Sequence, residues 1–450
     1  MTAPTSLTES TTTTTGADQA SATVATSYEE APTLRLCTAG SVDDGKSTFV
    51  GRLLHDTKSI LTDQLESVER VSAARGLQNP DLSLLVDGLR AEREQGITID
   101  VAYRYFASDR RSFILADTPG HVQYTRNTVT GMSTSDLVVI LVDVRNGVIE
   151  QTRRHLTVAA LLDIPQVVVA VNKIDAVDYS QEAFDTAAGQ VRELVDELRG
   201  AFGEQKLPVV DIVPISALVG DNVVSKSENT PWYEGESVLT ILEDARPAAV
   251  ATEEFRFPVQ FVIRDHATDY RGYAGRITSG EVAVGDTVHA GFRSTRVAGI
   301  DTPDGPQQRA TAGQSVTLRL EDELDISRGS ILSDETLPEP VTQFSALAFH
   351  LADAPVRVGS NLLLRYGPAE VRARVLGIDE QLSIADGAAA EAGTAGEPAT
   401  ALEQNDVARI RVAVADPLPV EAYVRGGQTG SFLLINPSTG DTLTAGLVSS

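Results

Sequence analysis

Apolar residues in the first half of the chain form nearly continuous runs, separated by segments with a helical pattern. Asp136–Asp143 and Gln166–Asn172 are almost wholly apolar, as strands buried on both faces of a parallel sheet must be. Leu34–Ala39 and Val209–Ser216 are further strand candidates, and Glu150–Leu162 is a helix candidate. This alternation predicts an α/β domain with a doubly wound, mostly parallel sheet.

The second half of the chain changes to a period of two. Apolar residues recur at every second position of one stretch, and short strand patterns with glycine turns continue to the C-terminus: Phe255, Phe257, Val259, Phe261 and Ile263. The length of this half suits two small all-β barrels better than one. A proline-containing break at Leu337–Val341 is the expected junction between them.

These patterns divide the chain into a tail and three domains. Residues 1–32 are rich in Thr, Ser and Ala and are expected to be disordered. The α/β domain is expected over 33–248, and the two β-barrels over 249–340 and 341–450. Within the last barrel, Ala385–Asn405 is rich in Ala, Gly and Glu and lacks a strand pattern, so we expect a flexible loop inserted between two strands.

The charge of the chain restricts the class of partner. Its 450 residues include 63 acidic and 37 basic side chains, for a formal net charge of −26. Such a surface repels phosphate backbones, which argues against nucleic acid as the main partner. The acidic excess is either a solvated surface or, less commonly, a face made for a specific partner.

The single cysteine, Cys37, excludes an intramolecular disulfide and a cysteine metal site, and fits a reducing cytoplasm. No run of about 20 apolar residues predicts a membrane span, and the N-terminus does not have the pattern of a secretory signal. The histidines outside the motifs below, His155 among them, have no ligand spacing and are expected to be structural or surface residues.

A phosphate-binding loop follows the first strand candidate. Its glycines allow backbone N–H groups to turn inward around phosphates, Lys46 supplies positive charge, and the Ser47 hydroxyl suits magnesium. The strand before it and the helix candidate after it are the context that such a loop needs. The expected GTP-binding residues here are Gly40, Ser41, Val42, Asp43, Asp44, Gly45, Lys46, Ser47 and Thr48.

Two further segments suit the other end of a nucleoside triphosphate. Asp117 follows a strand candidate and can hold magnesium through water, and the Gly120 N–H can meet the γ-phosphate. Upstream, Thr98 can complete the magnesium shell. The expected metal ligands are therefore Ser47, Thr98 and Asp117, and the expected binding loop is Asp117, Thr118, Pro119, Gly120 and His121.

Guanine specificity is expected from the segment after the strand Gln166–Asn172. The carboxylate of Asp175 can accept from guanine N1–H and from the exocyclic amine, a donor pair that adenine lacks. Backbone N–H groups after the last strand can support the same base. The expected residues are Asn172, Lys173, Ile174 and Asp175, with Ser216, Ala217 and Leu218.

The order of these motifs, with barrels downstream, resembles the translation-factor superfamily of GTPases. Within it, several stretches resemble the GTPase subunit of bacterial two-subunit sulfate adenylyltransferase: 87–104, 121–127, 220–224, 231–233, 271–276 and 325–329. Two positions depart from the usual pattern of that family, Val122 after the histidine and Met132 in place of a small residue.

The resemblance implies a division of labour between two subunits. The large subunit binds and hydrolyses GTP with Mg²⁺, with His121 orienting the attacking water and Lys46 binding phosphate. A small partner subunit joins AMP from ATP to sulfate, giving adenylylsulfate and pyrophosphate, and GTP hydrolysis drives this unfavourable reaction in sulfate assimilation. No second P-loop is present, so no adenylylsulfate kinase activity is expected.

Two other functions remain open from the sequence. One is a translational elongation factor that binds aminoacyl-tRNA, against which the charge of −26 argues. The other is a regulatory switch with no metabolic reaction.

Overall fold

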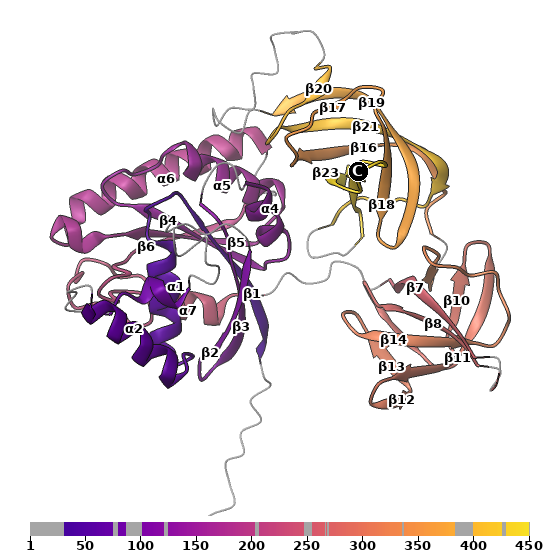
Figure 1. The fold of residues 1–450 in the computed structure, drawn as a ribbon, viewed down its shortest axis with the longest axis horizontal. Coiled ribbons are helices and arrows are strands. Elements are labelled where there is room, and N and C mark those ends of the chain that lie inside the picture. Colours follow the sequence, from indigo (N-terminus) through magenta and orange to yellow (C-terminus); the bar gives the residue numbers. More distant parts are fainter. Residues whose placement is uncertain are drawn as a thin grey trace, which may run out of the picture.

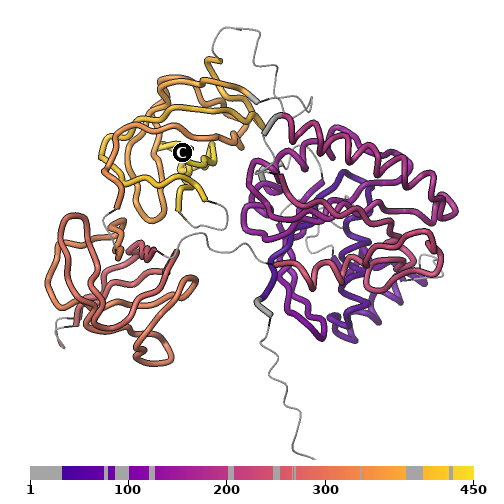
Figure 2. The backbone as a smooth tube through the Cα atoms, turned by 180° about the vertical axis from the view of Figure 1, so that it is seen from behind, coloured from indigo at the N-terminus to yellow at the C-terminus, as the bar shows by residue number. Residues whose placement is uncertain are grey.

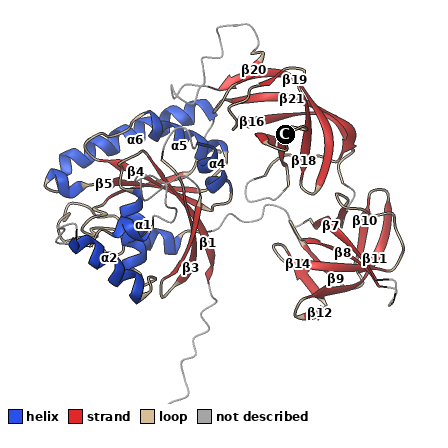
Figure 3. Ribbon diagram, in the orientation of Figure 1, coloured by secondary structure: helices blue, strands red, loops and turns tan. Residues whose placement is uncertain are grey.

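The computed structural model describes residues 31–74, 80–86, 101–120, 125–202, 207–246, 254–265, 267, 270–334, 337–382, 399–424 and 429–449. Within them the chain forms one region of mixed helices and strands, followed by two regions built from strands (Figures 1 and 3). Thr98 and His121 lie outside the described residues.

The first region is built on one six-stranded sheet in the order β2-β3-β1-β4-β5-β6. All neighbouring pairs of these strands are parallel except β2 with β3. The predicted doubly wound, mostly parallel sheet is therefore confirmed. The strands are β1 (Ala31–Gly40), β2 (Ala102–Ala107), β3 (Arg111–Asp117), β4 (Leu137–Asp143), β5 (Gln166–Asn172) and β6 (Val209–Pro214). β1 starts inside the expected N-terminal tail, because Ala31 already pairs with Arg111.

Helices cover both faces of this sheet, each over its own apolar core. One core receives side chains from α4, α5 and α6, and the other from α1 and α7. The sheet can be buried on both sides because β4 is apolar up to its last residue, Asp143, and buried at every position. The helices are α1 (Lys46–Asp56), α2 (Thr62–Ala74), η1 (Leu82–Leu85), α4 (Thr125–Ser133), α5 (Glu150–Leu161), η3 (Ile174–Val177), α6 (Gln181–Phe202) and α7 (Val238–Asp244).

The second region is a ring of antiparallel strands. Its sheet runs β10-β15-β7-β8-β14-β11-β12, and a further pairing of β10 with β11 returns the ring to its start. The alternation of Phe255, Phe257 and Val259 supplies its apolar interior. The strands are β7 (Arg256–Asp265), β8 (Tyr270–Arg276), β9 (Glu281–Ala283), β10 (Thr287–Ala290), β11 (Arg293–Thr302), β12 (Gly305–Gln307), β13 (Arg309–Thr311), β14 (Ser315–Leu320) and β15 (Ile331–Ser333).

The third region is a closed barrel in the order β16-β21-β19-β18-β22-β23, in which β23 pairs back with β16. A separate pair, β17 with β20, includes Ala401 and Leu402, so the segment expected to lack strands over 385–405 does contain one. The strands are β16 (Val341–His350), β17 (Val356–Arg357), β18 (Asn361–Tyr366), β19 (Ala369–Leu382), β20 (Ala401–Leu402), β21 (Val407–Leu418), β22 (Ser431–Ile435) and β23 (Thr442–Val448).

This barrel lies against the helices α4 and α5 of the first region (Figures 1 and 2). Phe349 and Val407 of the barrel are buried in the same apolar cluster as Val129 of α4 and Leu162 after α5. A cavity of about 860 Å³ lies beside this contact and is lined from both sides. Because α4 follows the loop after β3, the barrel rests on an element directly connected to the expected nucleotide site.

Candidate nucleotide-binding site

The phosphate loop connects β1 to α1 at the carboxyl edge of the sheet. Gly45 stands directly before α1 with φ of +91°, a conformation that side chains other than glycine rarely adopt. A Cβ there would lie 2.4 Å from Asn172 Nδ2. Glycine is therefore required both by the turn and by the close approach of Asn172 at the end of β5.

Lys46 lies inside this loop and is only 8% exposed. Its Nζ donates to the carbonyl oxygens of Gly40 and Ser41, both at 3.1 Å. Burial lowers the pKa of Lys46, while Asp117, Asp44 and Asp43 act in the opposite direction. The ammonium is thus held in a low-dielectric position by neutral hydrogen-bond partners, where a phosphate would be a stronger partner.

The loop is braced from within by Asp44, which is 4% exposed. Its carboxylate accepts from the Ser41 N–H at 2.7 Å. Burial raises the pKa of Asp44, whereas this backbone hydrogen bond and the charge of Lys46 lower it. The bond holds the loop closed over the Lys46 side chain.

The loop after β3 reaches the same place. Thr38 Oγ1 donates to Asp117 Oδ1 at 3.0 Å, and Thr118 Oγ1 donates to the Thr38 carbonyl at 2.7 Å. A Cβ on Gly120 would lie 2.2 Å from Lys46 Nζ and 2.5 Å from the Gly40 carbonyl oxygen. The structure therefore brings Gly120 directly against the phosphate loop, and only glycine fits there.

Asn172 connects the third predicted segment to the phosphate loop. Its Nδ2 donates to the Asp44 carbonyl at 2.8 Å, and its Oδ1 accepts from the Ala217 N–H at 2.9 Å. One side chain thus ties the phosphate loop to both of the segments expected to hold a base. Asp175 is the second residue of η3, which follows Lys173, and is partly exposed.

Lys173 is held from two sides, with its backbone at φ of +65°. Its Nζ donates to the Asp43 carbonyl of the phosphate loop and lies 3.0 Å from Asp143 Oδ2. Asp143 was not among the residues predicted for the site. Burial acts to raise the pKa of Asp143, but its bonds to Arg145 and Lys173 outweigh this and keep the pKa below its usual range.

The segment after β6 offers fewer free donors than the sequence suggested. The Ser216 N–H donates to the Asp221 carbonyl and the Ala217 N–H to Asn172. Within the described residues, the Leu218 N–H has no acceptor, and Leu218 itself is 60% exposed. Of the three predicted residues, Leu218 is therefore the one with a backbone donor left for a ligand.

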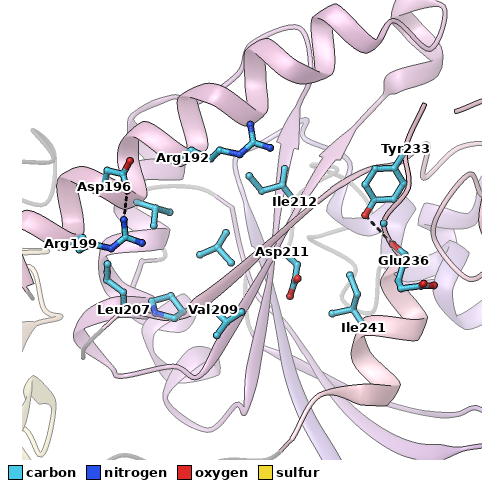
Figure 4. Close-up of a pocket in the computed structure, with 14 residues that line it drawn as sticks. Arg192, Asp196, Arg199, Leu207, Val209, Asp211, Ile212, Tyr233, Glu236 and Ile241 are labelled. Carbon is cyan, nitrogen blue, oxygen red and sulfur yellow. Dashed lines mark hydrogen bonds and ion pairs between the residues drawn. The ribbon is translucent and has the colours of Figure 1, made fainter. Parts of the chain in front are cut away.

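A cavity of about 860 Å³ lies away from this site, between α6, β6 and α7 (Figure 4). It contains none of the predicted residues, and several of its polar side chains already have partners: Arg199 bonds Asp196, and the Tyr233 hydroxyl donates to the Glu236 carbonyl. Chemistry, rather than cavity size, therefore locates the site at the phosphate loop. Separately, none of the helices in the described ranges is long and apolar enough to cross a membrane.

Comparison with known families supports both ends of this architecture. The family of the Elongation factor Tu GTP binding domain matches residues 31–251, and the GTP-eEF1A C-terminal domain-like family matches residues 343–449. The first match covers all the described motifs, so GTP is a ligand of this domain type.

Curated relatives match nearly the whole chain. The "Bifunctional enzyme CysN/CysC" of Mycobacterium tuberculosis (strain CDC 1551 / Oshkosh) is 46% identical over 423 residues, 92% of this chain and 67% of the relative. "Sulfate adenylyltransferase subunit 1" of Alteromonas mediterranea is 45% identical over 94% of this chain and 88% of the relative. The protein of the same name from Bacteroides thetaiotaomicron is 44% identical over 93% and 87%. The chain therefore belongs to the sulfate adenylyltransferase subunit 1 family.

Proposed function

We propose that this chain is the GTPase subunit of a sulfate adenylyltransferase and acts with a separate small subunit in the cytoplasm. The chain binds and hydrolyses GTP, and the small subunit joins AMP from ATP to sulfate, releasing pyrophosphate. The free energy of GTP hydrolysis then drives formation of adenylylsulfate. In this proposal the GTPase unit spans 33–248, and the barrels span 249–340 and 341–450.

The observation that carries the GTP site is the position of Lys46. A buried ammonium whose Nζ bonds are to two neutral carbonyls has an unmet electrostatic demand. The β- and γ-phosphates of GTP meet that demand with charge-assisted bonds. Gly120, packed against the same ammonium, is where a backbone N–H detects the γ-phosphate.

The residues present also fit Mg²⁺. Ser47, in the first turn of α1, and Asp117, at the end of β3, offer a hydroxyl and a carboxylate, the hard oxygen donors that magnesium prefers. Thr98 is proposed as the third protein ligand. When bound, Mg²⁺ would neutralise charge on the β- and γ-phosphates.

The rest of the chemistry is positioning by this chain. The phosphate loop directs backbone N–H groups at the phosphates, Lys46 stabilises the charge that develops on them, and His121 orients the attacking water by analogy with the family. The water oxygen bonds to the γ-phosphorus as the bond to the β–γ bridging oxygen breaks, giving phosphate and GDP.

The base is proposed to be read by Asp175, supported by Asn172 and Lys173. Asp175→Asn should shift preference from GTP to xanthosine triphosphate, because an amide can donate to the xanthine 2-oxygen but cannot accept from the guanine amine. Competition binding with both nucleotides measures the shift. Unchanged GTP preference in the variant would refute this assignment of the base pocket.

The division of labour is tested by measuring phosphate release and pyrophosphate release in parallel. The chain alone should hydrolyse GTP slowly and make no adenylylsulfate. Addition of the small subunit, ATP and sulfate should raise GTP turnover and start adenylylsulfate formation together. Adenylylsulfate synthesis by the isolated chain would overturn the proposal.

The elongation-factor alternative is not favoured, since the relatives that match most of the chain are sulfate adenylyltransferase subunits. A filter-binding assay with aminoacyl-tRNA checks this directly. We expect the chain with GTP to retain no more aminoacyl-tRNA on the filter than the same chain without GTP.

A further inference from the structure

Arg52 connects the helix of the phosphate loop to the loop expected to face the base. It lies on α1, and its side chain is 17% exposed. Its Nε donates to the Ala217 carbonyl at 3.3 Å, and its guanidinium also donates to the Leu218 carbonyl. A weaker contact of 3.5 Å joins it to Asp56 on the same helix.

The bond to the Ala217 carbonyl fixes the orientation of the peptide that precedes Leu218, and the bond to the Leu218 carbonyl fixes the next peptide. In a trans peptide, the C=O of one residue and the N–H of the next point in opposite directions. With the Ala217 carbonyl held toward Arg52, the Leu218 N–H must point away from Arg52. That N–H is the donor for which the described part of the chain provides no acceptor.

The remaining bonds of the loop leave this orientation to Arg52. Ser216 and Gly220 are joined by a backbone bond of 2.7 Å, and the Val219 N–H donates to Ser216 Oγ at 3.1 Å. Neither bond involves the peptide between Ala217 and Leu218. Gly220, at φ of +105°, lets the chain turn closely over the Arg52 side chain. A Cβ placed on Gly220 would lie 3.4 Å from Arg52 Cδ.

We propose that Arg52 is a positioning residue for guanine recognition, holding the Leu218 N–H as a donor to the 6-oxygen of the base. This rests on the proposed GTP site. Asp175 reads the donor edge of guanine and the Leu218 N–H reads its acceptor. Because Arg52 belongs to the helix that begins at Lys46, the acceptor contact is set by the same rigid element that holds the phosphates.

Ligand analogues separate this role from a general effect on folding. 6-Thio-GTP keeps N1–H and the 2-amine but replaces the 6-oxygen by sulfur, a weaker acceptor. Inosine triphosphate keeps the 6-oxygen and lacks the amine. Arg52→Met keeps most of the apolar stem and removes every donor, so it should weaken GTP binding about three- to tenfold.

The decisive measurement is the ratio of dissociation constants. Wild type should bind GTP more tightly than 6-thio-GTP. In Arg52→Met the ratio of the dissociation constants for 6-thio-GTP and GTP should fall toward one. The preference for GTP over inosine triphosphate, which reports Asp175, should be unchanged. Changing the residue and the ligand atom separately and together forms a double-mutant cycle, which measures the coupling between Arg52 and the 6-oxygen.

Three variants guard the interpretation. Arg52→Lys keeps a donor and should restore part of the 6-oxygen preference. Asp56→Asn removes the ion pair but keeps the carbonyl bonds, and Arg199→Met removes a surface arginine paired with Asp196; neither should change the ratio. Equal weakening of GTP and 6-thio-GTP in Arg52→Met would overturn the role of Arg52, whereas a wild type that binds no guanine nucleotide would overturn the proposed function itself.

Discussion

Lys46 and Arg256 are both buried basic residues, and their surroundings differ in kind. Lys46, in the phosphate loop, is 8% exposed, and its Nζ bonds are to two neutral carbonyls. Arg256, at the start of β7, is 5% exposed and contacts three carboxylates: Glu254 at 2.6 Å, Glu421 at 2.9 Å and Asp334 at 3.4 Å.

The difference indicates which cation serves a ligand. Arg256 has its charge fully matched, and because Glu421 belongs to the third region, the cluster joins the two barrels. Lys46 gives up little when its neutral partners are exchanged for phosphate oxygens, so binding gains most of the charge-assisted bond. Between Lys46 and Arg256, partner type rather than burial is therefore what differs.

Removal of the Lys46 charge should have the largest effect. Lys46→Ala should weaken GTP binding about a hundredfold or more, since at least two bonds between charged groups are lost. The GTP-dependent parts of phosphate release and of adenylylsulfate formation should disappear. Isothermal titration with GTP and the paired release assays measure both.

The same variant should leave the unfolding free energy of the nucleotide-free protein nearly unchanged, because a costly buried charge is removed together with its neutral bonds. If Lys46→Ala lost as much stability as we expect for Arg256→Met, Lys46 would be a structural residue, and the contrast between Lys46 and Arg256 would not hold.

Substitution of Arg256 should affect stability and not nucleotide. Arg256→Met leaves three carboxylates clustered without their cation, which should cost about 3 kcal/mol in the free energy of unfolding, the lower end for a broken buried pair. The value is at the lower end because Glu254 and Asp334 are 53% and 42% exposed and can be rehydrated. Denaturant unfolding gives the cost, and the dissociation constant for GTP should not change.

Arg256→Lys serves as its control, because it keeps the charge but cannot reach three carboxylates at once. An intermediate loss of stability is expected. If Arg256→Met weakened GTP binding as strongly as Lys46→Ala, the junction of the barrels would be part of the nucleotide site.

The sequence predicted the elements that have a local signal. β5 spans Gln166–Asn172 as its apolar run indicated, and α1 begins at Lys46 where the loop ends. It missed β20, because a two-residue strand has no measurable period. The roles of His121 and Thr98 stay predictions, since both lie outside the described residues.

Long-range partners could not be inferred in the same way. Arg256 bonds Glu421, and Arg52 bonds Ala217, each across 165 positions of sequence. Neither arginine lies in a motif, and either could equally have been a solvated surface residue. Only the tertiary fold shows that one contacts carboxylates and the other contacts carbonyls.

A buried histidine near Lys46 gives a smaller, pH-dependent effect. His155 on α5 is 1% exposed, and burial, followed by the charges of Lys46 and Arg154, lowers its pKa to about 3. Its unfolded pKa is about 6.5, so as pH falls below that value the unfolded state takes up the proton first. Stability should therefore decline from pH 6.5 downward, by on the order of 2 kcal/mol at pH 5.

His155→Gln removes this titration. The difference between the unfolding free energies at pH 7 and pH 5 should be smaller in the variant than in wild type by about 2 kcal/mol. Lys46→Met should reduce the wild-type loss slightly, because Lys46 is a minor contributor beside burial. Equal pH dependence in wild type and His155→Gln would mean that this ring is already hydrated in the folded protein.

The smallest effect is expected at Lys173, whose partners are of both kinds: the Asp143 carboxylate and the Asp43 carbonyl. Asp143→Asn keeps an acceptor for Lys173 but removes the charge, so Lys173 should hold its position less firmly beside the base. We expect GTP binding to weaken about fivefold, corresponding to about 1 kcal/mol, with the rate of hydrolysis at saturating GTP unchanged. Asp136→Asn is the matched control, because Asp136 immediately precedes β4 and its carboxylate accepts the Arg35 N–H at 3.0 Å. Since the Asp143 pKa lies below its usual range, the carboxylate stays ionised across neutral pH, and the ratio of the wild-type and variant constants should not change between pH 6 and pH 8. Loss of GTP affinity as large as that of Lys46→Ala would show that a carboxylate partner does not mark a cation as structural, and would remove the basis of the comparison.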